Sequence, residues 1–218
     1  MDAYWIEKDI KEQRITELEI ENGWYLPIGA LLDLMPEVYA RILQENYDLI
    51  TTAAGSSHNH QAWRGGYLDH VVETMNIACQ QFRWMDKVRV LPFTLYEALE
   101  VLFLHDIEKP WKYAPNRELP AAPELRANSS FRCLPVKTKE DRKKFRDAVI
   151  EHYKIELTDD QKNALRYIEG VPDSEYTPGE RTMGELAAFC HTCDILSARM
   201  WHDQGKDVVH GAIRWGSQ

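Results

Sequence analysis

The sequence predicts an all-α fold, and three observations support this prediction. Apolar residues recur at helical spacing from Pro36 onward. Three segments open with a capping box, in which a Thr is followed three residues later by Glu or Gln. After residue 30 no stretch alternates apolar and polar residues as a half-buried strand does. A chain of 218 residues is long enough to bury a core without disulfides.

The N-terminal segment, residues 1–35, mixes aromatic and charged residues without a clean period. We expect a short irregular extension that packs on the core. A short strand pair, formed by Tyr4 to Ile6 and Trp24 to Ile28, is the alternative. The main domain is expected to be a single helical bundle over residues 36–210.

The first helix of this domain is predicted over residues 36–54, because Pro36 suits a first helical turn and Gly55-Ser56-Ser57 breaks the pattern. A second helix is expected from Tyr67 to Trp84. Further helices are expected at Lys139 to Lys154 and after the capping boxes that begin at Thr94, Thr158 and Thr182. The proline-rich stretch from Pro110 to Val136 is expected to be a long loop.

Ionisable residues fall on faces that should be buried. In the helix after Thr94, the stripe marked by Leu99 and Leu102 continues to Asp106, with His105 beside it. A buried, unpaired carboxylate costs several kcal/mol. Asp106 therefore needs a cation.

Two other predicted helices carry the same feature. Asp194 lies on the apolar face of the last helix, and His70 lies beside Val71 in the helix from Tyr67. Taken singly, each such residue is more often a hydrogen-bonded core residue or a cap. Taken together, His70, His105, Asp106 and Asp194 form a suitable ligand set for a divalent ion. We expect Mn, Co, Fe, Mg or Zn, as one ion or two.

These residues resemble the ordered His…His-Asp…Asp signature of the HD superfamily of metal-dependent phosphohydrolases. The segment Arg64-Gly-Gly-Tyr-Leu-Asp-His70 is similar to the glycine-rich start of that family's first ligand helix. Leu104-His-Asp-Ile-Glu-Lys109-Pro resembles its His-Asp segment, and Leu186 to Arg199 resembles its last ligand helix. The resemblance covers residues 36 to about 204. Glu108 departs from it, because many relatives carry Gly there.

The resemblance implies an HD-domain-like helical bundle that hydrolyses a phosphate ester with metal-activated water. Residue chemistry agrees, because Asp106 could orient the attacking water and Lys109 could stabilise charge on the phosphate. We expect these two residues to be catalytic. Substrate binding is expected from Arg64, His58, His60 and Trp63, although a surface charge, loop contacts and core packing would explain them equally well.

The expected substrate is a small phosphorylated molecule, favoured as a nucleotide because aromatic residues flank the ligands. A phosphodiesterase or 3'-5' exonuclease acting on cyclic or short oligonucleotides is the alternative enzyme. A non-catalytic nucleotide-binding regulatory module is the alternative outside enzymes. The net charge of −9 argues against broad binding to duplex nucleic acid. A homo-oligomer is compatible with the sequence.

Three features of the sequence indicate the cellular compartment. The N-terminus is acidic where a signal peptide would be basic and then apolar, and no apolar run is long enough for a membrane span. The four cysteines show no regular disulfide spacing. A cytoplasmic protein is expected. The Cys190-His-Thr-Cys193 motif favours two buried helix residues over a structural zinc site.

Overall fold

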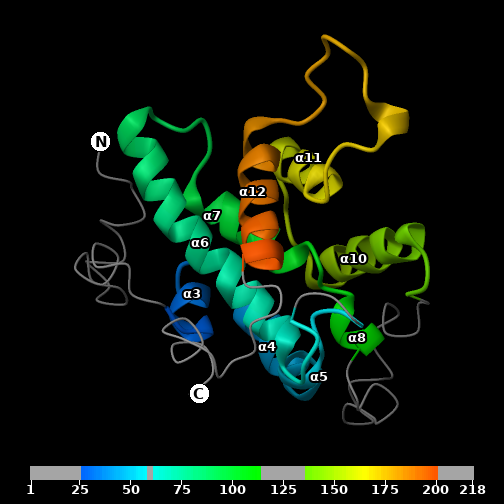
Figure 1. The fold of residues 1–218 in the computed structure, drawn as a ribbon. Helices are drawn as coiled ribbons and strands as arrows, with labels where there is room; N and C mark the ends of the chain where they lie inside the picture. The colour runs from blue at the N-terminus through cyan, green and yellow to red at the C-terminus, as the bar shows by residue number, and fades with distance from the viewer. Residues whose placement is uncertain (1–25, 58–60, 114–135, 201–218) are drawn as a thin grey trace. The chain divides into compact units, whose positions relative to one another are not determined.

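The computed structural model describes residues 26–57, 61–113 and 136–200. All regular structure in these ranges is helical, which confirms the all-α prediction for them (Figure 1). The chain forms two compact units, each assembled from separate segments. One unit contains residues 1–36, 72–105 and 157–197, and the other contains residues 37–71, 106–156 and 198–218.

The unit that begins at residue 37 holds four helices and the start of a fifth among the described residues. They are α4 (Glu37–Glu45), α5 (Tyr47–Thr52), α8 (Lys109–Tyr113), α10 (Lys139–Tyr153) and the first turns of α6 (Gly66–Val88). The helix α5 packs on α4 and on α8. The rings of Trp111 and Phe145, 5.1 Å apart, hold α8 against α10.

The helix predicted over residues 36–54 is instead two helices separated at Asn46. The Asn46 side chain donates to the carbonyl oxygen of Ile42 at 2.8 Å and to the Tyr153 hydroxyl at 3.2 Å. Asn side chains that bond backbone groups compete with helix continuation. The Tyr153 hydroxyl in turn donates to Glu45 at 2.7 Å, so the break is also an attachment point for α10.

The other unit contains α3 (Ile28–Leu32), the rest of α6, α7 (Leu95–Leu104), α11 (Asp159–Tyr167), the 3-10 turn η2 (Asp173–Glu175) and most of α12 (Glu185–Met200). The part of α12 that belongs to this unit ends at Ser197. The helix α11 packs on α7. Phe82, Phe93 and Phe189 meet with ring centroids 5.3 to 6.3 Å apart. Cys190 and Cys193 are buried on α12, as predicted for a pair of helix residues.

Two of the three predicted capping boxes are confirmed. Thr94 and Thr158 each accept from the backbone three residues later, where Glu97 and Gln161 reach back. The third is wrong, because α12 begins at Glu185 rather than just after Thr182.

A residue on another helix explains the difference. Asn163 of α11 accepts from the backbone N–H of Gly184 at 2.9 Å and donates to the carbonyl oxygen of Thr182 at 3.0 Å. A capping box that the sequence analysis did not identify, between Thr138 and Asp141, opens α10.

The described part of the chain contains no helix long and apolar enough to cross a membrane. Within it, Ile28 begins α3, so the last residue of the alternative strand pair is helical. The remainder of the N-terminal segment up to residue 25 lies outside the described residues. The predicted boundary at residues 35 and 36 stays a prediction.

Candidate metal centre

The first turn of α6 is set by a close backbone approach that only glycine allows. A Cβ atom on Gly66 would lie 1.9 Å from the carbonyl oxygen of Gln61. Gly65, just before it, has a φ of +82°, which is left-handed and costs a side-chain-bearing residue energy. The two glycines of the predicted motif therefore allow the chain to turn tightly into α6 and place His70 one turn inside the helix.

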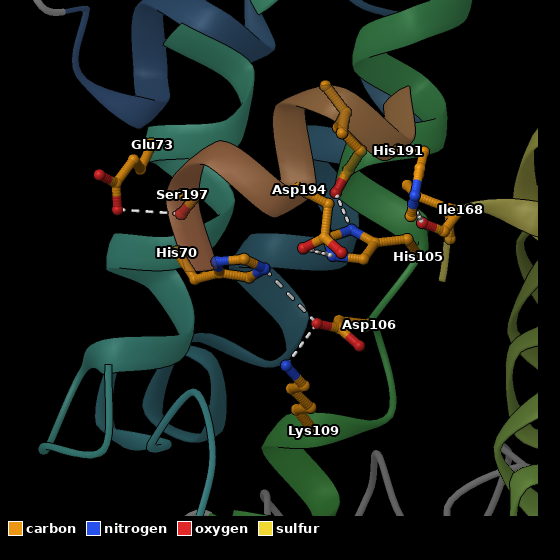
Figure 2. A network of polar contacts seen from close by, with 10 residues as sticks. His70, Glu73, His105, Asp106, Lys109, Ile168, His191, Asp194 and Ser197 are labelled. Atoms are coloured by element: carbon orange, nitrogen blue, oxygen red, sulfur yellow. Dashed lines mark hydrogen bonds and ion pairs between the residues drawn. The ribbon is translucent and has the colours of Figure 1, made fainter. Parts of the chain in front are cut away.

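His70 and Asp106 face each other in the unit that begins at residue 37. His70 is fully buried, and its Nε2 lies 3.7 Å from Oδ2 of Asp106. The same carboxylate oxygen lies 2.5 Å from Nζ of Lys109 (Figure 2). Residues 105–108 form the turn between α7 and α8, and the backbone N–H of Lys109 donates to the carbonyl oxygen of Asp106 at 2.9 Å. This turn brings the lysine back over the aspartate.

His105 ends α7 and is oriented by its own helix. Its Nδ1 lies 2.7 Å from the carbonyl oxygen of Leu102, which can only accept, so Nδ1 carries the proton. The lone pair of the neutral ring is then on Nε2, 3.7 Å from Oδ1 of Asp194. A backbone carbonyl that fixes the tautomer in this way is typical of metal-ligating histidines.

His70, His105 and Asp106 make up one cluster, in which one ligand atom from each lies within 4.8 Å of the others. Two donors about 2.1 Å from a shared ion lie about 3.0 to 4.2 Å apart for bond angles between about 90° and 180°. The 3.7 Å separation of His70 and Asp106 is in this range. Two imidazoles and a carboxylate suit Mn, Fe, Co or Zn, and the buried cluster fits one divalent ion.

Asp194, the fourth predicted ligand, contacts His105 but is not part of that three-residue cluster. Its side chain is 20 % exposed, against 2 % for His105. Asp194 therefore lies at the edge of the candidate centre, where it would complete the ligand set or hold the ring of His105.

The cation that Asp106 needs is supplied in part by Lys109. From the sequence we expect a metal ion alone in that role, but the Lys109 ammonium contacts the buried carboxylate directly. The lysine side chain is only 12 % exposed. It was predicted to act on the substrate phosphate, and its position beside a candidate ligand is compatible with that role.

Two further acidic groups, which the sequence analysis did not include, surround Asp106. Burial raises the pKa of Glu108 to about 7, and the charge of Asp106 adds to the rise, while Lys109 and Arg142 oppose it. Burial also raises the pKa of the Tyr67 hydroxyl, with Asp106 and Glu108 adding to the effect. So many acidic groups in a buried place favour the binding of a cation there.

The structure describes only two of the four predicted substrate-binding residues. Arg64 is exposed on the turn before α6. Trp63 is half-buried, and its indole N–H donates to Oδ2 of Asp69 at 2.6 Å, which ties it to the first turn of α6. His58 and His60 lie outside the described residues, and the substrate-binding roles of all four residues stay predictions.

Another buried acidic side chain lies one turn beyond His70 on α6. Glu73 is fully buried, and its Oε2 accepts from the Ser197 hydroxyl of α12 at 3.0 Å. Glu73 was identifiable from the sequence in the same way as Asp106, because it follows His70 by three residues and residues three apart share a helix face. Its partner Ser197 is distant in the sequence, so only the structure identifies the pair.

No known protein family matches this chain, and neither does any curated protein or solved structure. The resemblance to the HD superfamily therefore depends on the residues quoted above.

Proposed function

We propose that this chain is a metal-dependent phosphohydrolase that cleaves a phosphate ester of a small nucleotide. The observation that carries the proposal is the buried cluster of His70, His105 and Asp106 with Lys109 on its carboxylate. A divalent ion held there would lower the pKa of a bound water and polarise a phosphoryl oxygen. Three protein ligands leave coordination positions for water and substrate.

The protein residues would divide the work as follows. His70 and His105 present ring nitrogens from α6 and the end of α7, and the carbonyl oxygen of Leu102 keeps Nε2 of His105 free of a proton. Asp106 would supply the negative ligand and could orient the attacking water. These groups are buried, so little reorganisation is needed when the substrate binds.

Lys109 would act on the phosphate. Its ammonium is held 2.5 Å from Asp106, so it would lie close to a phosphate bound at the metal and would stabilise the negative charge that develops on the phosphoryl oxygens. The half-buried ring of Trp63, fixed to Asp69, offers a flat surface near the start of α6 for a base. These two features support a nucleotide as the substrate class and a phosphohydrolase as the assignment.

The test is a substrate panel. Nucleoside mono-, di- and triphosphates, cyclic nucleotides and a short single-stranded oligonucleotide are incubated with Mn²⁺, Co²⁺, Mg²⁺, Ni²⁺ or Zn²⁺, and the products are separated by chromatography. We expect phosphate or triphosphate release from a nucleotide, abolished by Asp106→Asn and retained by Thr192→Ala, an exposed position on α12. Cleavage of only cyclic nucleotides or the oligonucleotide would assign the phosphodiesterase alternative. Binding without turnover of any compound would assign the non-catalytic module.

A further inference from the structure

The buried pair of Glu73 and Ser197 has no role in the reaction as described above, yet it lies one turn from two candidate ligands. Glu73 follows His70 by three residues on α6, and Ser197 follows Asp194 by three residues on α12. Residues three apart lie on the same face of a helix. Each helix therefore presents a candidate ligand and, one turn further on, a member of the pair (Figure 2).

Burying this pair costs free energy. Glu73 and Ser197 are both completely buried, and the Ser197 hydroxyl donates to Oε2 of Glu73 at 3.0 Å. Moving a carboxylate out of water carries a desolvation cost, whereas apolar residues of similar size would pack there without that cost. Buried polar pairs of this kind are well suited to fixing how two elements align.

The side chains around Ser197 make the rotation of α12 depend in part on this hydrogen bond. The large buried side chains of α12, Leu186 and Phe189, lie in its first two turns. From Cys190 to Ser197 the buried residues of α12 are small, so close packing of large side chains holds this part of the helix less firmly. Here the directional hydrogen bond of Ser197 adds to the alignment.

We propose that the hydrogen bond between Ser197 and Glu73 is a clamp that positions Asp194 as a metal ligand. The clamp fixes the rotation of α12, and the Asp194 carboxylate is thereby held at 3.7 Å from Nε2 of His105. Glu73 and Ser197 are positioning residues that act through Asp194. The inference depends on the metal centre and not on the reaction that the centre catalyses.

The test measures the affinity for Mn²⁺ alone, by electron paramagnetic resonance of the free ion. Ser197→Ala should raise the Kd for Mn²⁺ severalfold, which is less than the roughly 10- to 100-fold effect of losing a group bonded directly to a ligand, because Ser197 acts through the position of Asp194. Glu73→Gln keeps an acceptor oxygen for Ser197 and should stay near the wild-type Kd. Thr192→Ala is the control, since Thr192 is exposed and its hydroxyl donates to the carbonyl oxygen of Ala188 on the same helix.

A double-mutant cycle separates positioning from general loosening of the fold. In an Asp194→Asn background, Ser197→Ala should change the Kd by less than about twofold, because the residue through which it acts is already altered. Equal effects in both backgrounds would overturn the proposal, as would an unchanged Kd in Ser197→Ala or a wild-type chain that binds no Mn²⁺. Mn²⁺ binding without hydrolysis would overturn the proposed function and leave the clamp intact.

Discussion

The ring of His105 is fixed by the last turn of its own helix. Because Nδ1–H of His105 donates to the carbonyl oxygen of Leu102, Nε2 carries the lone pair and faces Asp194 at 3.7 Å. That distance is too long for a hydrogen bond and suits two donors around a common ion.

Asp194→Asn distinguishes a metal ligand from a residue that accepts hydrogen bonds only. A neutral amide is a poorer ligand for a divalent ion, so we expect weaker Mn²⁺ binding and activity that recovers partly with excess Mn²⁺ or Co²⁺. Asn accepts from backbone N–H groups as well as Asp does. A metal titration of this variant, followed by activity, checks the prediction, and wild-type behaviour would remove Asp194 from the ligand set.

Lys109→Ala should affect turnover and metal binding in opposite directions. Removing a charge-stabilising donor typically lowers turnover on the order of a hundredfold or more. Removing a cation 2.5 Å from Asp106 should also strengthen Mn²⁺ binding, because like charges repel. Lys109→Arg, which keeps the charge, is the matched control for metal affinity. Parallel loss of metal and activity in Lys109→Ala would show that the lysine only holds Asp106 in place.

At the scale of the element, α6 depends on Gly66. Gly66→Ala should lower the free energy of unfolding by about 2 kcal/mol or more, because its Cβ would overlap the carbonyl oxygen of Gln61. Gly29→Ala is the matched control: its Cβ meets nothing within 4 Å, so the helix α3 should be unchanged or gain up to about 1 kcal/mol. Urea unfolding of both variants makes the comparison. Equal stability of the two would contradict the close approach.

Helix ends were predictable where the cap is local. The boxes at Thr94 and Thr158 lie within one turn of sequence, and both form. The start of α12 was predicted wrongly because its cap comes from Asn163, a residue of α11. No pattern within residues 182–185 carries that information.

The residues of the candidate site divide in the same way, into those with a local signal in the sequence and those that depend on another helix. Helical periodicity identified His70, His105 and Asp106, because a polar residue on an apolar face is visible in sequence. The pairing of Lys109 with Asp106 spans three residues and was also within reach of that reasoning. The influence of Arg142 on Glu108 was not, because it depends on where α10 lies within its unit.

At the scale of the whole molecule, three cysteines report on the integrity of one unit. Cys79, Cys190 and Cys193 are buried there, and burial raises the pKa of the Cys190 and Cys193 thiols. Since the thiolate is the reactive form, native protein at pH 8 should react slowly with a thiol reagent. Unfolding should expose the thiols and make them react quickly. The assay uses a Cys133→Ser background. Fast stoichiometric labelling of the native chain would contradict this burial.

The central claim, that His70, His105 and Asp106 hold a divalent ion, is tested most directly by metal content. Wild-type chain, His105→Ala and Asp106→Ala are equilibrated with Mn²⁺, dialysed and analysed for metal per chain, with circular dichroism as the check on folding. We predict at least one retained ion per wild-type chain, and loss of tight retention in both variants with nearly unchanged helical content. Full metal occupancy in both folded variants would contradict the account.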